Sequence, residues 1–283
     1  MDTVPHLFRP DGSIDSALAF VSLLGGVIPP AEQSFAKLFD QFDSALRQQR
    51  PDVHQNALSN VHGDWYEWLI ALAAWNYHTE NTQSLVALPL PNAQNFDVAQ
   101  LYVPELYKFV QDLRATVQQE ANVELITSNP DFVILNVAGL PQADLLLQPI
   151  ELVEVATLQG IQNRYADFIG LCSLNRIVGY AAVKRSLRPD RRLQIPHEGS
   201  LMKALYRHLQ TRLWLLNPPG IRYYALAGQM SNADQQALRT VATHSITTVF
   251  NTPEPAVDDF FVVDSISQAI SAFQTMLAVP PDA

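Results

Sequence analysis

The sequence has a single cysteine, few charges and no long apolar run, and each scarcity excludes a class of protein. Cys172 is the only cysteine among 283 residues, so no intrachain disulfide framework can form and a reducing cytosol is compatible. We expect its thiol to be a small buried hydrophobe. The early apolar stretch 18–30 ends in two prolines and is too short to cross a bilayer of about 30 Å. Asp2, Asp11 and Asp15 come early, whereas a secretory signal has a basic segment ahead of an apolar core, and a soluble protein is therefore predicted.

The charge of the chain is low and unevenly distributed. Charged residues make up 16% of the sequence and hydrophobic residues 48%, as in a globular protein with a modest polar shell. The net charge of −10 argues against a general nucleic-acid coat protein, which would need a widespread positive field. One dense basic segment nevertheless spans positions 184–192, with Lys184, Arg185, Arg188, Arg191 and Arg192. Such a segment can bind DNA locally, especially if metal ions offset nearby carboxylates.

The hydrophobic periodicity predicts an α/β protein with a sheet flanked by helices. We expect a single domain over residues 1–283, with a helical N-terminal part of about residues 1–80. The main predicted helices cover residues 13–26, 31–49, 56–80, 97–121, 198–216 and 265–277. The predicted strands cover residues 85–90, 123–128, 131–137, 177–185, 220–228 and 245–250.

Four charged residues stand where a metal-dependent phosphodiesterase would need them. Asp131 opens a predicted strand, Lys184 closes a later one, and Glu198 lies in the first turn of the helix that follows. Glu67 is the only charge in the apolar run 65–77. Carboxylates bind the hard ion Mg²⁺, and a lysine near the scissile phosphate favours hydroxide and offsets developing charge.

Each of these residues also has an ordinary structural explanation. An Asp after Pro commonly caps a turn, a Glu in a first helical turn answers the helix dipole, and a Lys at a strand end is usually solvated. Glu67 can be the buried partner of an arginine. The usual second carboxylate of such nucleases is missing, since Ala182 stands there, and we expect Glu198 to fill that space.

The segment between Lys184 and Glu198 is predicted to be a loop that reads bases. Arg188 and Arg191 offer guanidiniums that bond guanine O6 and N7, and Asp190 can accept from cytosine N4. This set suits G·C pairs in the major groove. The alternative is an ion pair within a solvated loop.

The helix after Glu198 has an apolar face of leucines. A second row of side chains at helical spacing consists of Lys203, Arg207, Gln210 and Trp214. Trp214 fits either the core or a subunit contact. Four histidines lack zinc-like spacing and are interpreted as structural or polar surface residues: His62, His197, His208 and His244.

Five stretches carry a resemblance to a known family: GDWYEWLI, LITSNPDF, LRPDRRLQIPHEGSLMKALYRHLQTR, GIRYYA and TVATHSIT. With them the chain resembles the type II restriction endonucleases that cut around a CCGG core, in particular the branch that recognises RCCGGY. The matching stretches spread over most of the chain, and residues 138–175 are the least distinctive. The resemblance implies the PD-(D/E)xK nuclease fold, a mixed central sheet with helices on both sides.

In this branch the second carboxylate has moved from the strand to the next helix. Asp131, Lys184 and Glu198 match that pattern, Ala182 occupies the vacated place, and Glu67 matches a further acidic residue of the site. The resemblance implies that Asp131 and Glu198 hold Mg²⁺ with help from Glu67, while Lys184 aligns the water.

The family's Lys-x-x-x-Arg-x-Asp-Arg element is matched from Lys184 to Arg191. Arg188, Asp190 and Arg191 would read the inner C·G pairs, and Arg222 is assigned to the outer pair. The implied reaction hydrolyses each strand between the purine and the first cytosine, leaving a 5′-phosphate and a four-base 5′ overhang.

A palindromic site implies a homodimer, and members of this branch commonly pair two dimers into a homotetramer. Trp214 is assigned to that second contact, and the resemblance implies a cytoplasmic bacterial enzyme of a restriction-modification system. Two alternatives remain open. A repair or recombination nuclease would share Asp131, Lys184 and Glu198 without needing the base-reading set. A DNA-binding protein that has lost cleavage is disfavoured by the intact site.

Overall fold

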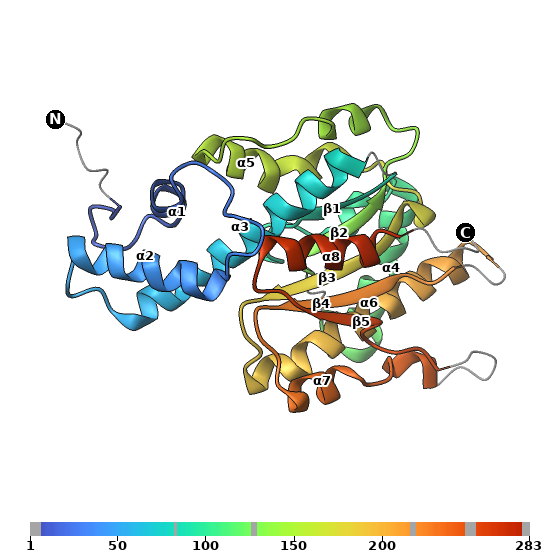
Figure 1. The fold of residues 1–283 in the computed structure, drawn as a ribbon. Helices are drawn as coiled ribbons and strands as arrows, with labels where there is room; N and C mark the ends of the chain where they lie inside the picture. The colour runs from blue at the N-terminus through green and yellow to red at the C-terminus, as the bar shows by residue number, and fades with distance from the viewer. Residues whose placement is uncertain (1–6, 82–83, 126–128, 216–218, 247–252, 279–283) are drawn as a thin grey trace.

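A five-stranded mixed sheet lies at the centre of the computed structural model, which describes residues 7–81, 84–125, 129–215, 219–246 and 253–278 (Figure 1). The strands are β1 (Leu85–Pro89), β2 (Phe132–Asn136), β3 (Ile177–Lys184), β4 (Arg222–Ala227) and β5 (Asp259–Val262). They follow one another across the sheet in sequence order. The pairs β1–β2 and β2–β3 are antiparallel, whereas β3–β4 and β4–β5 are parallel. The prediction of a mixed sheet flanked by helices is confirmed.

Helices cover both faces of this sheet. They are α1 (Ser16–Leu24), α2 (Phe35–Gln49), α3 (Gln55–Asn81), α4 (Pro104–Ala121), α5 (Val155–Asn163), α6 (Pro189–Arg212), α7 (Asn232–Leu238) and α8 (Ile266–Met276). Helices α3 and α8 pack together on one face, and α4 and α6 pack together on the other (Figure 1). None of the helices within the described ranges is long and apolar enough to span a membrane.

The long helix α3 joins the sheet to the helical N-terminal region. Its middle part is buried almost all round, because α1 and α2 pack on one side of it and the sheet lies on the other. An aromatic cluster holds α1, α2 and α3 together, with Phe20, Phe42 and Trp65 in edge or tilted ring contacts. Helices were predicted for all three of these segments, and the structure confirms them.

Helix α6 differs from its prediction in a way that changes the site. It begins at Pro189 and not at Glu198, so the predicted base-reading loop is largely helical and Glu198 lies well inside the helix. Pro189 suits a first helical position, because its missing N–H needs no partner there and its φ is already helical. Pro196 lies inside the helix, where a proline ordinarily disfavours helical structure by about 3 kcal/mol. The buried contacts of the helix with the sheet offset that cost. Such tertiary contacts cannot be recognised from the local sequence pattern.

Two of the predicted strands, 123–128 and 245–250, are not strands at the residues that the structure describes. Residues 123–125 are irregular and residues 245–246 belong to a 3₁₀ turn, while 126–128 and 247–250 lie outside the described residues. Strand β5 was not predicted, because it is short and only partly buried.

Candidate active site in a cleft beside strand β3

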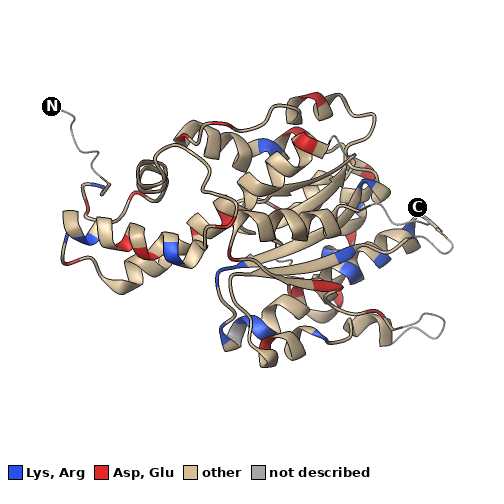
Figure 2. Ribbon diagram, in the orientation of Figure 1, with Lys and Arg blue, Asp and Glu red and all other residues tan. Residues whose placement is uncertain are grey.

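A cleft of about 670 Å³ lies between the first half of α3 and the connection from β3 into α6. The helix side contributes Asn60, Gly63 and Glu67. The opposite side is basic, and Figure 2 shows Lys and Arg residues gathered on the connection from β3 into α6. Lys184, Arg185, Arg188 and Arg191 all line the cleft. Cations at the wall of a cleft raise the local concentration of an anionic ligand such as DNA.

Asp131 and Lys184 meet because β2 and β3 are antiparallel neighbours. Asp131 directly precedes β2, and Lys184 is the last residue of β3. The Asp131 carboxylate accepts a 2.6 Å hydrogen bond from the backbone N–H of Val183. The Lys184 ammonium donates to both carboxylate oxygens, at 2.8 and 2.6 Å. The carboxylate is thereby fixed beside the lysine.

The lysine stays charged in this setting. Burial lowers the pKa of Lys184, but the charge and the hydrogen bonds of Asp131 raise it, as do the charges of Glu67 and Glu198 at the high pH where a lysine titrates, and the pKa stays above its ordinary value. A charged lysine can donate to a phosphate oxygen and stabilise the charge that develops there. All three predicted carboxylates lie close enough to the lysine to act on it electrostatically.

Glu67 reaches the cluster from α3, on the other side of the cleft. Burial raises the pKa of Glu67 from 4.5 to about 8, and the charge of Asp131 raises it too, against the effects of Lys184 and Arg191. At pH 7 the carboxyl group therefore holds its proton most of the time. A carboxylate that is destabilised by burial and by a second carboxylate would be stabilised by a bound cation.

Glu198 enters the site from the opposite face of the sheet, on α6. Its side chain is 5% exposed. One carboxylate oxygen accepts from the Gln194 amide at 2.8 Å, and the other accepts from the Tyr223 hydroxyl at 3.0 Å. The next residue, Gly199, permits this close approach. A Cβ there would collide with the Ala256 carbonyl oxygen and lie 3.0 Å from the Tyr223 ring.

Glu198 lies over the face of the sheet to which Ala182 belongs. Tyr223 of β4 pairs in parallel register with Tyr180 of β3, so their side chains point to the same face. Side chains alternate along a strand, and Ala182 and Lys184 therefore share this face with Tyr180. A glutamate on the covering helix can thus serve the position at which the strand carries only a methyl group.

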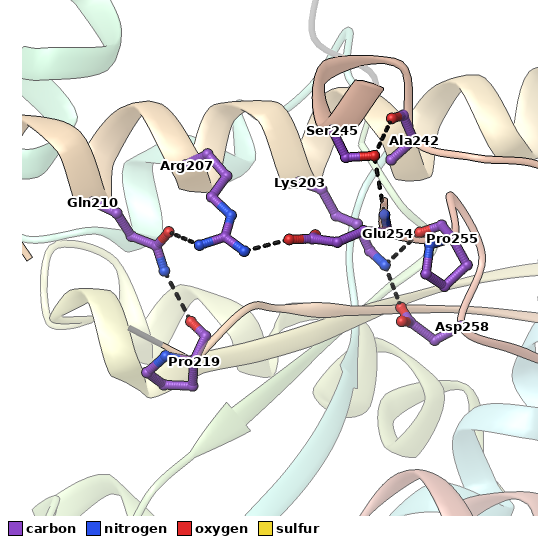
Figure 3. A network of polar contacts seen from close by, with 9 residues as sticks. All are labelled: Lys203, Arg207, Gln210, Pro219, Ala242, Ser245, Glu254, Pro255 and Asp258. Carbon is purple, nitrogen blue, oxygen red and sulfur yellow. Dashed lines mark hydrogen bonds and ion pairs between the residues drawn. The ribbon is translucent and has the colours of Figure 1, made fainter. Parts of the chain in front are cut away.

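A second polar network fixes α6 against the segment that leads into β5 (Figure 3). The Lys203 ammonium donates at 2.7 Å to the Pro255 carbonyl oxygen and lies 2.7 Å from the Asp258 carboxylate. Asp258 also accepts from the Tyr223 backbone N–H at 2.6 Å. One turn along the helix, Arg207 pairs with Glu254. The helix that carries Glu198 is thereby tied to β4, which carries the hydroxyl partner of Glu198.

Two of the three predicted base-reading residues can be placed in the cleft wall. Arg188 is exposed at the N-cap position of α6, and Arg191 donates to the Ser186 carbonyl oxygen at 3.2 Å. The side chain of Asp190 lies outside the described part of the structure.

Arg222 and Trp214 do not join this cluster. Arg222 begins β4 and pairs in register with Gly179, whereas Lys184 pairs with Ala227 at the other end of the strands. Trp214 follows the C-terminus of α6, is 89% exposed and has a φ of 55°.

The sequence interpretation missed several residues that contact the site. The Gln194–Glu198 pair has the i, i+4 spacing of helical neighbours, which would have been recognisable had the helix been started at Pro189. Tyr223 had no such pattern. His62, which was interpreted as structural or polar surface, is buried beside Arg185 and bonded to it.

The carboxylates suit a divalent cation in their chemistry. Among the residues that the structure describes, no three acidic, His or Cys side chains are close enough together to bind a metal ion by themselves. Mg²⁺ is usually held by one or two carboxylates with the remaining positions filled by water and substrate oxygens. Asp131 and Glu67, whose charges disfavour one another, are two hard oxygen groups near Lys184, and Glu198 is a third.

Three comparisons with known proteins agree. A family model described as Cfr10I/Bse634I restriction endonuclease matches residues 32–278. The Type II restriction enzyme Cfr10I of Citrobacter freundii is 40% identical over 274 residues, which cover 94% of this chain and 95% of that enzyme.

Solved structures of Bse634I superpose on the same chain. The crystal structure of the Type IIF restriction endonuclease Bse634I with cognate DNA has a TM-score of 0.86 and 28% identity over 96% of each chain. A second Bse634I structure has a TM-score of 0.86 and 29% identity, covering 94% of this chain and 93% of that one. Sequence, family model and fold therefore place the chain in the Cfr10I/Bse634I restriction endonuclease family, as a type II site-specific deoxyribonuclease.

Proposed function

We propose that this enzyme cuts double-stranded DNA at RCCGGY, with Mg²⁺ as its metal ion. Each strand is hydrolysed between the purine and the first cytosine, which leaves a 5′-phosphate and a four-base 5′ overhang. The observation that carries the proposal is the Asp131–Lys184 pair, coupled to Glu67 and set in a cleft lined with arginines. The relative Bse634I was solved with cognate DNA, which supports a DNA duplex as the occupant of the cleft.

Asp131 and Glu198 hold the metal ion in this proposal, and Glu67 assists. The ion, when bound, supplies a Lewis acid for the phosphate and lowers the pKa of a bound water. Lys184 would orient the attacking water and stabilise the charge that grows on the phosphate oxygens. The hydrogen bonds from Gln194 and Tyr223 set the direction of the Glu198 carboxylate.

The inner C·G pairs are read by Arg188, Asp190 and Arg191. The two arginines line the cleft that holds Lys184, which supports base contacts close to the cutting site. Arg222 is proposed for the outer pair. Because it begins β4 at the end away from Lys184, only a part of the duplex outside the cleft could reach it.

A palindromic site is cut by a two-fold dimer, and we propose that two dimers join through Trp214. A tryptophan that is 89% exposed has a large apolar surface for a partner to cover. Its left-handed backbone conformation, uncommon for a bulky residue, turns the chain directly after α6.

Plasmid digestion tests the proposal. One plasmid carries RCCGGY sites and a matched plasmid lacks every CCGG, and both are incubated with enzyme and Mg²⁺. Discrete fragments from the first plasmid alone, with ends that map after the purine, are expected. Smearing of both plasmids would indicate a nonspecific repair-type nuclease, and binding without cutting would favour the non-cleaving alternative.

A further inference from the structure

We propose that Arg185 binds a DNA phosphate beside the Lys184 site, and that a buried Asp43–His62 pair holds its guanidinium for that contact. The inference rests on the proposed function of the cleft as a DNA site, and it adds residues from the helical N-terminal region to that site. The ligand chemistry is a phosphodiester.

Arg185 is placed at the edge of the cleft next to the proposed catalytic lysine. It directly follows Lys184 and lines the same cleft as Arg188 and Arg191. It also borders a smaller cavity of about 180 Å³, whose wall includes Phe39 of α2. Its guanidinium lies over the Phe39 ring at 5.6 Å from the centroid.

A chain of two hydrogen bonds connects Arg185 to the interior of the N-terminal region. Arg185 Nη1 lies 2.5 Å from His62 Nδ1, and His62 Nε2 lies 2.7 Å from the Asp43 carboxylate. His62 is on α3 and is 1% exposed, whereas Asp43 is on α2 and is 8% exposed. Because both ring nitrogens of the buried His62 have a hydrogen-bond partner, the three side chains hold one another in a defined orientation.

The direction of these bonds is set by chemistry. A guanidinium can only donate, so His62 Nδ1 must accept, and the ring proton lies on Nε2 and is donated to Asp43. Burial lowers the pKa of His62 and the Arg185 charge lowers it too, while the hydrogen bond to Asp43 raises it; the net shift is downward. The imidazole is therefore neutral at pH 7, and Asp43 selects the tautomer that receives the arginine.

A neutral partner leaves the arginine its charge. Arg192 pairs directly with the Asp234 carboxylate and Arg207 with Glu254. In the described ranges no carboxylate forms an ion pair with Arg185, and the imidazole ring stands between its guanidinium and Asp43. The guanidinium is oriented without being neutralised, which suits an anionic ligand that arrives from solution.

The test measures how DNA binding depends on salt. Each phosphate contact that is lost lowers the slope of log K against log[salt] by about 0.9 for duplex DNA. Binding of an RCCGGY duplex is measured in EDTA between low and moderate salt for Arg185→Gln and for Arg192→Gln. We expect the first variant to weaken binding and to reduce the slope by about 0.9 for each subunit on the DNA. Arg192 belongs to the same basic segment and already pairs with a carboxylate, so its variant keeps the wild-type slope.

The role of the buried pair is tested at His62. His62→Phe retains a ring to stack on Phe39 but has no acceptor for Arg185. We expect it to bind DNA more weakly than the wild type, as Arg185→Gln does. His62→Gln can accept from Arg185 and donate to Asp43, so we expect it to recover most of the affinity. Thermal melting of each variant reports whether it is folded at the assay temperature. If His62→Phe does not fold, His62→Leu takes its place as the variant without an acceptor.

An unchanged slope in Arg185→Gln would overturn the phosphate contact. Wild-type binding by the folded variant without an acceptor, or binding by His62→Gln as weak as by Arg185→Gln, would overturn the positioning role. These failures differ from failure of the proposed function, which would be seen in the wild-type enzyme as equal binding of RCCGGY and scrambled duplexes.

Discussion

Helix α6 contributes residues to two polar clusters that differ in how their charges are paired. Around Lys203 and Arg207 each cation meets a carboxylate, and the remaining donors reach carbonyl oxygens (Figure 3). In the cleft, the carboxyl of Glu67 has its pKa raised to about 8, and Arg185 is held by a neutral ring. The first cluster is balanced internally, whereas the second is arranged for ions that come from outside.

The difference supports the proposal that the cleft cluster performs the chemistry. A balanced network has little to gain from a ligand, and its role is to keep α6 in register with β4 and β5. A cluster with a destabilised carboxylate, and with a guanidinium held by a neutral ring, gains free energy when metal and phosphate bind, which is typical of an active site. Removing a member should therefore affect stability in the first cluster and activity in the second.

The largest expected effect is on cleavage, at Asp131. Asp131→Ala removes the carboxylate that fixes Lys184 and that is proposed to hold the metal ion. We expect cleavage of an RCCGGY plasmid to fall by ~10²–10³-fold or more, while the protein remains folded. Initial rates and a thermal melt measure the two quantities. Normal turnover by the folded variant would remove Asp131 from the site.

The matched loss in the other cluster should destabilise the fold and spare the chemistry. Lys203→Met leaves Asp258 without its cation at a position where the lysine is 3% exposed. We expect the free energy of unfolding to fall by about 3 kcal/mol, toward the lower limit for a buried pair because Asp258 is partly exposed. Urea unfolding measures the loss. Cleavage per folded molecule should stay within a few-fold of wild type, and a loss as large as that of Asp131→Ala would contradict the comparison.

Glu67 gives the cleft a pH signature that the Lys203 network lacks. Its folded pKa of about 8 is above its ordinary value of 4.5, so the folded protein binds this proton more tightly than the unfolded chain does. Stability contributed by this group is present at low pH and is lost as pH rises from about 4.5 to 8. Glu67→Gln should remove this slope, which is at most about 1.4 kcal/mol per pH unit. The free energy of unfolding, measured in EDTA at several pH values, gives this slope. An unchanged slope in the variant would mean that a group other than Glu67 titrates.

Discrimination between bases should change by a smaller amount. Arg188 lines the cleft at the start of α6 and is proposed to contact an inner C·G pair. Arg188→Ala should lower the preference for CCGG over a substituted core by roughly 1–3 kcal/mol, the usual value of one good base contact. Competition binding with duplexes substituted at single base pairs measures the change. Equal losses on all duplexes would indicate a phosphate contact in its place.

Most of the fold could be predicted because its elements have strong local patterns. Helices α2, α3 and α8 and strands β1 to β4 have clear periodicity or apolar runs, whereas β5 is short and partly exposed. The start of α6 was missed because two prolines and a charged segment favour a loop locally. Packing of that segment against the rest of the chain overrode the local preference.

The residues of the candidate site stand out in the sequence only where they are unusual for their surroundings. Glu67 interrupts an apolar helix, and Asp131 and Lys184 stand at strand ends. Asp43 lies on an amphipathic helix in which a carboxylate normally faces water, and no carboxylate stands three or four residues from His62 in the sequence. Their contact is formed by the packing of α2 on α3, which no local pattern specifies.

The smallest effect on either cluster is expected at Trp214, which lies beyond the C-terminus of α6 and is 89% exposed. Since no described contact joins its ring to the cleft or to the Lys203 network, Trp214→Ala should change neither the free energy of unfolding nor the cleavage chemistry of a bound site. It should change assembly, because the proposed contact between dimers loses its largest apolar side chain. Light scattering should show a shift in mass from tetramer toward dimer. An unchanged mass would leave the tryptophan without a role in assembly, and a loss of stability instead would mean that α6 depends on its last turn more than the exposed position indicates.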